Sequence, residues 1–146
     1  MTAPTARFIL NVEQRVYVEK PWGHEDWIYN GRYCGKKLHV NKGKESSFQY
    51  YKVKDAVMHV ESGKIQLTYG WDEDISHAAT ITLTPDMAFH IPPGMWHKFA
   101  GIEQSVITEF STHHNDKDAV CAGQQNGTEN DDEEDGTEAA SDSRKS

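Results

Sequence analysis

Residues 90–99 read HIPPGMWHKF, and they place a double proline, a glycine and two histidines after a run that reads as a strand. Pro92 and Pro93 cannot donate hydrogen bonds to a β-ladder, so they mark a strand end or a bulge. The segment is then either a tight turn with incidental imidazoles or a turn that aims His97 at other groups. The choice depends on whether a second segment can supply partners for His97.

The second segment is SFQYYKV, which reads as a strand at residues 47–53. Residues two apart on a strand share a face, so Gln49 and Tyr51 point the same way. If that face lines the inside of a barrel, a neighbouring strand can bring His97 beside them. Three inward polar side chains in an otherwise apolar barrel would form a small-molecule or metal site. We therefore expect the turn to aim His97 into this site.

Short strand-like runs dominate the chain, and no amphipathic helix stands out. The runs are rich in β-branched and aromatic residues and are bounded by Gly, Pro, Asn or Asp. Many short strands at regular spacing predict an all-β fold, an antiparallel sandwich or barrel. The predicted strands are residues 15–20, 25–30, 36–41, 47–53, 56–62, 64–70, 80–84, 88–92, 97–101 and 105–110.

Two of these regions, residues 43–63 and 86–97, resemble the two signature segments of the cupin superfamily in the spacing of their Gly, Gln, Pro and His residues. Six segments narrow the resemblance to small single-domain cupins related to the cupin part of mannose-6-phosphate isomerase. These segments are EKPWGHEDWIYN, GKKLHVNKG, SSFQYYKVKDAV, ESGKIQLTYG, FHIPPGMWHKF and TEFST. The resemblance covers about residues 16–115 and implies an antiparallel double-stranded β-helix, a jelly-roll barrel.

In the family that this chain resembles, a Gln, a His, a Glu and a distant His hold the metal. Gln49 and His97 match two of these positions, but Tyr51 replaces the first His and Ala56 replaces the Glu. One imidazole and one neutral amide are a weak donor set for a divalent first-row ion. Tyr51 could ligate only as a phenolate, and its ordinary pKa is near 10. We expect no metal cofactor, and zinc, iron or manganese held by Gln49 and His97 is the alternative.

The second signature segment departs from the family at two further positions. Asp86 stands where a glycine is usual, and Gly101 stands where an asparagine is usual.

Other polar residues are weighed by their place on the predicted strands. His39 is open between the pocket and the outer face, and His90 has an uncertain face. Both are kept with Gln49, Tyr51 and His97 as predicted ligand-binding residues. By alternation from Ala56, His59 should point away from the interior.

Two histidines are expected outside the site, and two lysines have two alternative interpretations. His113 and His114 follow the last predicted strand and are expected to be solvated. Lys52 and Lys54 read as a charge pair that protects a strand edge, or as groups that meet a phosphate at the barrel mouth.

Three functions of different classes follow. The first is a cupin barrel that binds a small polar ligand, such as a sugar phosphate or nucleotide sugar, without catalysing a reaction of it. The alternative is a metal-dependent sugar-phosphate isomerase or epimerase, as the resemblance implies, with His97 as the candidate catalytic base. The third is a partner-binding protein that works through its C-terminal tail. Bound stoichiometric metal would separate the first two.

Charge and composition set the expected domain limits. The 146-residue chain has a net charge of −8, and residues 123–146 contribute −6 of it through eight acids and two bases. We expect an N-terminal extension at 1–15, a barrel at 16–115 and a disordered acidic tail at 116–146. The tail is either solubilising or a docking segment for a basic partner. The small negative charge of the folded part argues against nucleic-acid binding.

Two further expectations concern surroundings and assembly. No apolar run is long enough to span a membrane, and two distant cysteines, Cys34 and Cys121, fit free thiols in a reducing cytoplasm. The strand at residues 15–20 precedes an aromatic-rich run, and such an exposed edge is an available interface. We expect a homodimer.

Overall fold

The computed structural model describes residues 8–123, so most of the predicted acidic tail, residues 124–146, lies outside the described part of the chain. Short strands make up most of this part, with three single-turn 3₁₀ helices between or beside them. The strands are β1 (Val16–Lys20), β2 (Gly23–Asn30), β3 (Tyr33–Val40), β4 (Gln49–Tyr51), β5 (Ala56–Ser62), β6 (Ile65–Gly70), β7 (Ala79–Leu83), β8 (Ala88–Ile91), β9 (Trp96–Gly101), β10 (Ser105–Thr112) and β11 (Ala119–Cys121). The 3₁₀ helices are η1 (Val12–Gln14), η2 (Ile75–His77) and η3 (Asp116–Asp118).

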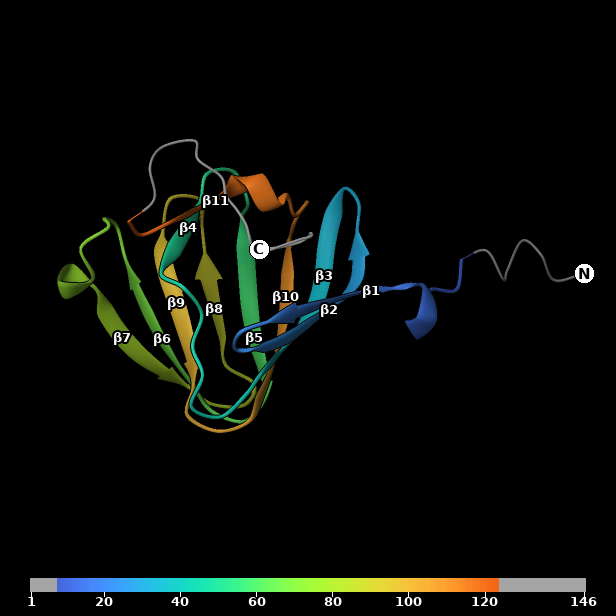
Figure 1. Cartoon of the computed structure of the whole chain (residues 1–146), viewed down its shortest axis with the longest axis horizontal. Helices are drawn as coiled ribbons and strands as arrows, with labels where there is room; N and C mark the ends of the chain where they lie inside the picture. The colour runs from blue at the N-terminus through green and yellow to red at the C-terminus, as the bar shows by residue number, and fades with distance from the viewer. Residues whose placement is uncertain (1–7, 124–146) are drawn as a thin grey trace, which may run out of the picture.

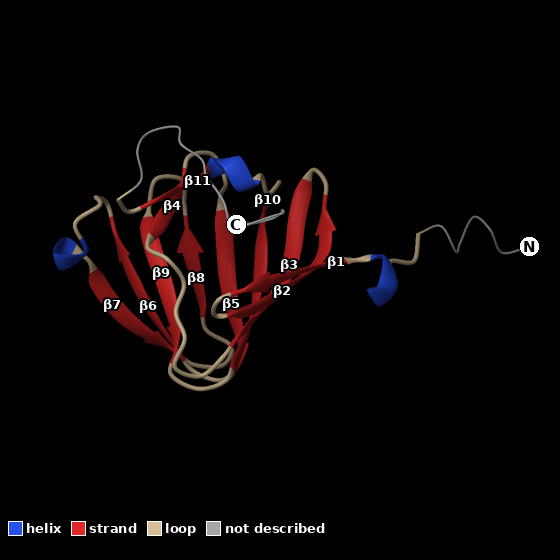
Figure 2. Ribbon diagram, in the orientation of Figure 1, coloured by secondary structure: helices blue, strands red, loops and turns tan. Residues whose placement is uncertain are grey.

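Two sheets form the walls of a barrel (Figures 1 and 2). One has six strands in the order β1-β2-β3-β10-β5-β8, and the other has five in the order β11-β4-β9-β6-β7. The strand pairs described are antiparallel. All ten predicted strands are present, and the predicted all-β jelly-roll architecture is confirmed.

The barrel interior is divided into an apolar end and a charged end. Along β3, burial alternates with every second residue, and Leu38 and Val40 point inward. Leu38 pairs with Ile107 of β10 in the apolar part. One step further along the same two strands, the inward pair is Lys36 with Glu109, both almost fully buried. The apolar core consists of Trp22, Leu38, Val40, Met58, Val60, Ile65, Leu67, Leu83, Ile91, Met95, Phe99 and Ile107.

The chain after β10 crosses the charged end of the barrel, and we call residues 113–123 the C-terminal strap (Figure 1). It includes η3 and β11, and β11 pairs with β4. At its start, Asn30 exchanges hydrogen bonds with the backbone of His114, at 2.8 and 3.0 Å. The expected barrel limit at residue 115 is therefore wrong, because the strap continues the fold to residue 123.

Asp118 explains both the strap's position and the shortness of β4. Its carboxylate oxygens accept hydrogen bonds from the backbone N–H groups of Val53 and Lys54, at 2.9 and 2.8 Å. The N–H group of Lys52 donates to the carbonyl oxygen of the same aspartate, at 3.2 Å. These donors go to the strap instead of to a neighbouring strand, so β4 ends at Tyr51 and not at the expected residue 53.

At the other end of the chain, residues 8–15 form an arm that leaves β1 and points away from the barrel (Figure 1). Its apolar side chains are exposed, with Phe8 at 76% and Val12 at 70%. Within residues 8–123, no helix has the length and apolar character that a membrane span requires.

Candidate functional site

The turn at residues 92–95 positions His97. Gly94 has a φ of +89°, and its N–H group donates to the carbonyl oxygen of Tyr51 at 2.9 Å, which fastens the turn to β4. A residue with a β-carbon is disfavoured in this conformation. The His97 ring is 2% exposed, and its Nδ1–H donates to the carbonyl oxygen of Met95 at 3.0 Å. The turn therefore aims His97 into the barrel, as the sequence predicts.

Gln49 and Tyr51 lie beside His97, as their spacing predicts. Gln49 is the direct partner of His97 in the antiparallel pairing of β4 with β9. Its side-chain Nε2 donates to the hydroxyl oxygen of Tyr51 at 3.3 Å. The Tyr51 and His97 rings are 5.5 Å apart between centroids. The structure therefore brings together the three residues on which the sequence argument depends.

Lys54 is the central cation of the site, although it was expected at a strand edge. Its side chain is fully buried, and its ammonium nitrogen lies 2.5 Å from a carboxylate oxygen of Glu109. The same nitrogen lies 2.9 Å from Nδ1 of His114 and 4.5 Å from the centre of the Tyr51 ring. The expectation of a solvated edge position is wrong: the Asp118 carboxylate binds the backbone N–H of Lys54, and the Lys54 side chain lies inside the barrel.

A second buried ion pair lies on the neighbouring strands. The ammonium nitrogen of Lys36, whose side chain is 1% exposed, lies 3.0 Å from Oε1 of Glu25. The same carboxylate oxygen accepts the indole N–H of Trp27 at 2.7 Å, and the ammonium lies 4.4 Å from a Trp27 ring centre. We call Glu25, Lys36, Lys54 and Glu109, with Tyr51, His97 and His114, the interior cluster.

His114 enters the interior cluster from the strap. It was expected to be solvated, but its side chain is 9% exposed and packs against Trp27 and Tyr51. Its Nε2 lies 2.7 Å from Oδ1 of Asp116. An Nε2–H that donates to this carboxylate leaves Nδ1 to accept a hydrogen bond from the Lys54 ammonium. The expectation fails because the strap folds back over the barrel instead of leaving it.

The carboxylates of the interior cluster are charged. Burial alone would raise the pKa of Glu109, but Lys54 and then Lys36 outweigh it and lower that pKa to about 2. Burial likewise opposes ionisation of Glu25, and Lys36 with Lys20 holds its pKa far below the usual range. Conversely, Glu25 outweighs burial at Lys36 and raises the pKa of that ammonium. The two carboxylates thus offset the two ammonium groups.

The remaining members of the interior cluster are neutral near pH 7. Burial, and then the charge of Glu109, raises the pKa of Tyr51 well above 10, so its phenol keeps its proton. Burial lowers the pKa of His97. Burial, followed by Lys36 and Lys54, lowers the pKa of His114 to about 4. With two cations and two anions, the cluster has no net charge.

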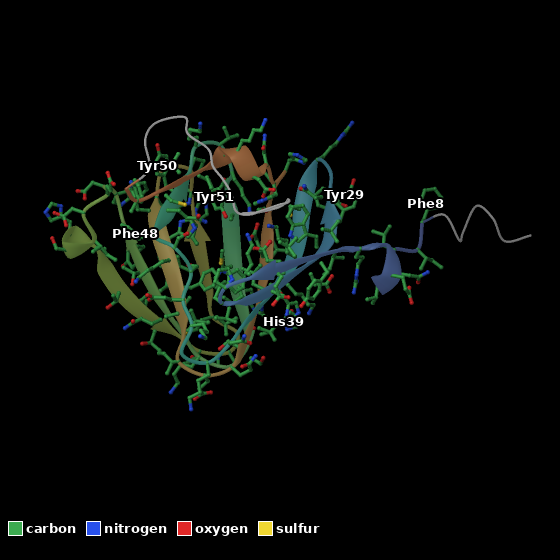
Figure 3. The ribbon with its side chains drawn as sticks, viewed as in Figure 1. Phe8, Tyr29, His39, Phe48, Tyr50 and Tyr51 are labelled. Atoms are coloured by element: carbon green, nitrogen blue, oxygen red, sulfur yellow. The ribbon has the colours of Figure 1, made fainter. Side chains whose placement is uncertain are left out.

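His39 and His90, the other two predicted ligand-binding residues, lie away from the cluster. His39 alternates outward between buried Leu38 and Val40, and its ring stacks on His24 at 4.3 Å (Figure 3). His90 is exposed, and its Nε2 lies 2.7 Å from Oδ1 of Asp55. Both rings point to solvent because of strand alternation, so the prediction that these two residues bind the ligand in the pocket is wrong. His59 points outward as expected and contacts Asp86.

Sequence reasoning missed Glu25, Lys36 and Glu109. A signal for two of them is present in the alternation of their strands. Lys36 has the same parity as Leu38, and Glu109 has the same parity as Ile107. A charged residue at the inward parity of an apolar strand indicates a buried, paired group. Their partners come from β2 and from the loop after β4, which sequence alternation does not identify.

The side chains at the family's metal positions offer few donors for a divalent ion. Gln49 offers an amide and His97 an imidazole, while Tyr51 is a protonated phenol and Ala56 has no donor. Lys54 adds an ammonium group that faces Tyr51. Among residues 8–123, no three His, Cys, Asp or Glu side chains are grouped to hold a metal. This donor set does not fit the ion.

The sequence matches no protein-family profile. No curated protein matches it either.

Solved structures, in contrast, resemble the fold closely. The capsular polysaccharide assembling protein CapF from Staphylococcus aureus superimposes with a TM-score of 0.64 at 15% identity, over 73% of this chain and 34% of CapF. KdgF from Halomonas sp. gives 0.61 at 13% identity, over 74% of this chain and 94% of KdgF. Oxalate decarboxylase from Bacillus subtilis gives 0.64 at 8% identity, over 75% of this chain and 30% of the enzyme.

The chain thus spans about a third of the length of CapF and of oxalate decarboxylase. All three proteins have cupin barrels. At these identities the likeness concerns the fold alone, and it agrees with the two sheets, the jelly-roll topology and the inward-facing Gln49, Tyr51 and His97. The chain has the cupin fold.

Proposed function

We propose that this protein is a metal-independent cupin that binds a small anionic carbohydrate, a sugar phosphate or nucleotide sugar, at the charged end of the barrel. The observation that carries the proposal is the convergence of two buried ammonium groups, those of Lys36 and Lys54, on the end of the barrel that holds Tyr51 and His97. Lysine ammonium groups bind phosphate as point charges, and neutral hydrogen-bonding groups beside them bind hydroxyl groups. CapF, a capsular polysaccharide assembling protein by name, supports a carbohydrate ligand.

The alternative, a metal-dependent isomerase, has support from the Mn(II) centres of oxalate decarboxylase. The side chains of this chain oppose it. A divalent cation at the family position would face the Lys54 ammonium across Tyr51, and both cluster carboxylates are already paired with lysines. Like charges in a weakly polar interior repel strongly. We therefore favour binding without metal.

Calorimetric titration of the metal-stripped protein tests the proposal. Fructose 6-phosphate and a nucleotide sugar are expected to bind, and fructose without its phosphate is expected to bind at least tenfold more weakly. Metal content is measured on the same protein before stripping. Equal affinity for fructose and its phosphate would contradict an anionic ligand. Stoichiometric metal that is needed for binding would support the isomerase instead.

The matched variants are Lys36→Met and Lys37→Met. The two lysines are neighbours on β3, but Lys36 is buried against Glu25 whereas Lys37 is exposed and pairs with Glu61. Only Lys36→Met is expected to weaken binding of the phosphate. Circular dichroism of both variants verifies that the barrel is folded, and the same loss in both would contradict a role for the interior charge.

A further inference from the structure

The interior cluster is closed to solvent. The side chains of Lys54, Glu109 and Lys36 are exposed by 0%, 2% and 1%, and His97 is 2% exposed. Any ligand that reaches these groups must therefore displace a part of the protein that covers them. The described cavity of about 290 Å³ lies elsewhere, beside the N-terminal arm and β2, and does not reach the cluster.

The C-terminal strap is the element that lies over the cluster. It is attached by the hydrogen bonds of the Asp118 carboxylate to the backbone of Val53 and Lys54, by the three-residue β11 and by the His114 contacts. In Figure 1, η3 and β11 lie across the end of the barrel above β4 and β5. β11 pairs with β4 over three residues only, and the strap's helix η3 is a single turn. A segment with few pairings opens at lower free energy than the sheets beneath it.

His114 fills the place beside Lys54 with a neutral ring. Its Nδ1 accepts from the ammonium at 2.9 Å, which is the hydrogen bond that a phosphate or carboxylate oxygen would accept. Burial, and then Lys36 and Lys54, lower the pKa of His114, so the ring that holds this place is neutral near pH 7. The strap also carries Asp116 and Asp118, whose carboxylates leave the barrel end when the strap lifts.

We propose that the position of the His114 ring is an anion-binding subsite for a phosphate or carboxylate group, and that the strap keeps His114 in it as a removable plug. This inference rests on the proposed function. An anionic ligand displaces the strap, and its oxygen replaces Nδ1 of His114 on the Lys54 ammonium. In the absence of ligand, the ring satisfies the buried ammonium and excludes water from it.

A disulfide that locks the strap to the barrel tests this proposal. Sγ of Cys121 in β11 lies 3.8 Å from Oγ of Ser47, just before β4. A Ser47→Cys variant therefore places two thiols within reach of a disulfide. The probes are inorganic phosphate and fructose 6-phosphate, measured by calorimetry on oxidised and on reduced protein. Disulfide formation is verified by mass spectrometry.

We expect oxidised Ser47→Cys to bind both probes at least tenfold more weakly than the reduced form. The control is Ser47→Cys combined with Cys121→Ser, which has no partner thiol and whose binding is expected to be insensitive to reductant. If oxidised and reduced Ser47→Cys bind the probes equally, the plug proposal is wrong. If the wild-type protein still binds the probes in that case, the proposed function stands. If the reduced and wild-type proteins bind neither probe, the proposed function fails and the plug fails with it.

A second variant measures the plug directly. His114→Ala removes the ring, and we expect it to bind inorganic phosphate at least fivefold more tightly than the wild type. His113→Ala is the matched control, because His113 is the exposed neighbour whose Nδ1 contacts the carbonyl oxygen of Gly31. Weaker phosphate binding by folded His114→Ala than by His113→Ala would show that the ring assists the anion, which contradicts the proposal.

Discussion

Lys54 and Glu109 form an ion pair inside the barrel, with 2.5 Å between nitrogen and oxygen and with side-chain exposures of 0% and 2%. The pair joins the loop between β4 and β5 to β10. A charge in such a place is tolerated only because it is paired. The cation paired with Glu109 at this end of the barrel is a side chain of the protein.

Breaking this pair is expected to cost much more than breaking an exposed one. Lys54→Met leaves the Glu109 carboxylate buried without its partner, and we expect a loss of about 3–5 kcal/mol in the free energy of unfolding. Lys37→Met, which breaks the half-exposed pair with Glu61, is expected to cost less than about 1 kcal/mol. Urea denaturation at pH 7 measures both. Similar losses in the two variants would contradict the buried character of the pair.

The stability of the protein is expected to fall between pH 6.5 and pH 4. Folding lowers the pKa of His114 from 6.5 to about 4, so in this range the unfolded chain binds a proton that the folded chain does not. Acidification therefore favours unfolding, by roughly 3 kcal/mol over the whole range if His114 acts alone. The lowered pKa of His97 acts in the same direction.

Urea midpoints at several pH values measure this effect. His114→Gln is expected to flatten the pH dependence between 6.5 and 4, while His113→Gln leaves it as in the wild type. If His114→Gln leaves the pH dependence of stability unchanged, other groups cause it. Below pH 4.5 a further loss is expected, because the unfolded chain then protonates Glu109 while folding holds the pKa of this carboxyl at about 2.

Most of the barrel and half of the site were predictable from sequence. The strands were evident because β-branched and aromatic residues alternate between turn residues. Gln49, Tyr51 and His97 were evident because their spacing and the proline turn fix their faces. The strap was not evident, because the three residues of β11 are too short for a pattern. Its position depends on Asp118 reaching two backbone N–H groups 64 and 65 residues earlier.

The same long-range contacts explain the errors at Lys54 and His114. A lysine at a predicted strand edge and a histidine after the last strand read as solvated from their neighbours alone. They become buried because the loop and the strap close on each other across the barrel end. Sequence spacing gives the face of a residue on a strand, but not the inward turn of a loop.

Asp86 has a φ of +75° at the position where the resembling family has glycine, and Asp86 is the one non-glycine residue in residues 8–123 with a positive φ. An L-residue in this conformation is strained by about 1 kcal/mol. The Asp86 side chain is 96% exposed, so its contact with His59 offsets little of that strain. We expect Asp86→Gly to raise the thermal midpoint and Asp86→Ala to lower it. A lower thermal midpoint for Asp86→Gly would show that the contact with His59 stabilises the fold by more than the strain costs.

Restoring the family's donors is expected to create metal affinity only partly. Tyr51→His with Ala56→Glu supplies the missing imidazole and carboxylate beside Gln49 and His97. Because the Lys54 ammonium lies 4.5 Å from the Tyr51 ring centre, it opposes a divalent ion there. Adding Lys54→Met should therefore raise zinc retention after dialysis further. His97→Ala in the same background should abolish it, and tight stoichiometric zinc in the unmodified protein would contradict the metal-independent proposal.

Finally, we expect a homodimer that forms through the N-terminal arm. β1 is the end strand of the six-stranded sheet, and an end strand can pair with another chain. Apolar residues on the arm and on β1 are exposed, including Phe8 at 76%, Val12 at 70% and Tyr17 at 62%. Light scattering at micromolar concentration is expected to give twice the chain mass. Val12→Lys should give monomers, whereas Phe110→Lys, the same kind of change at a 58% exposed residue of β10, should leave the dimer intact. A monomeric wild type, or dissociation by both variants, would remove the arm as the interface.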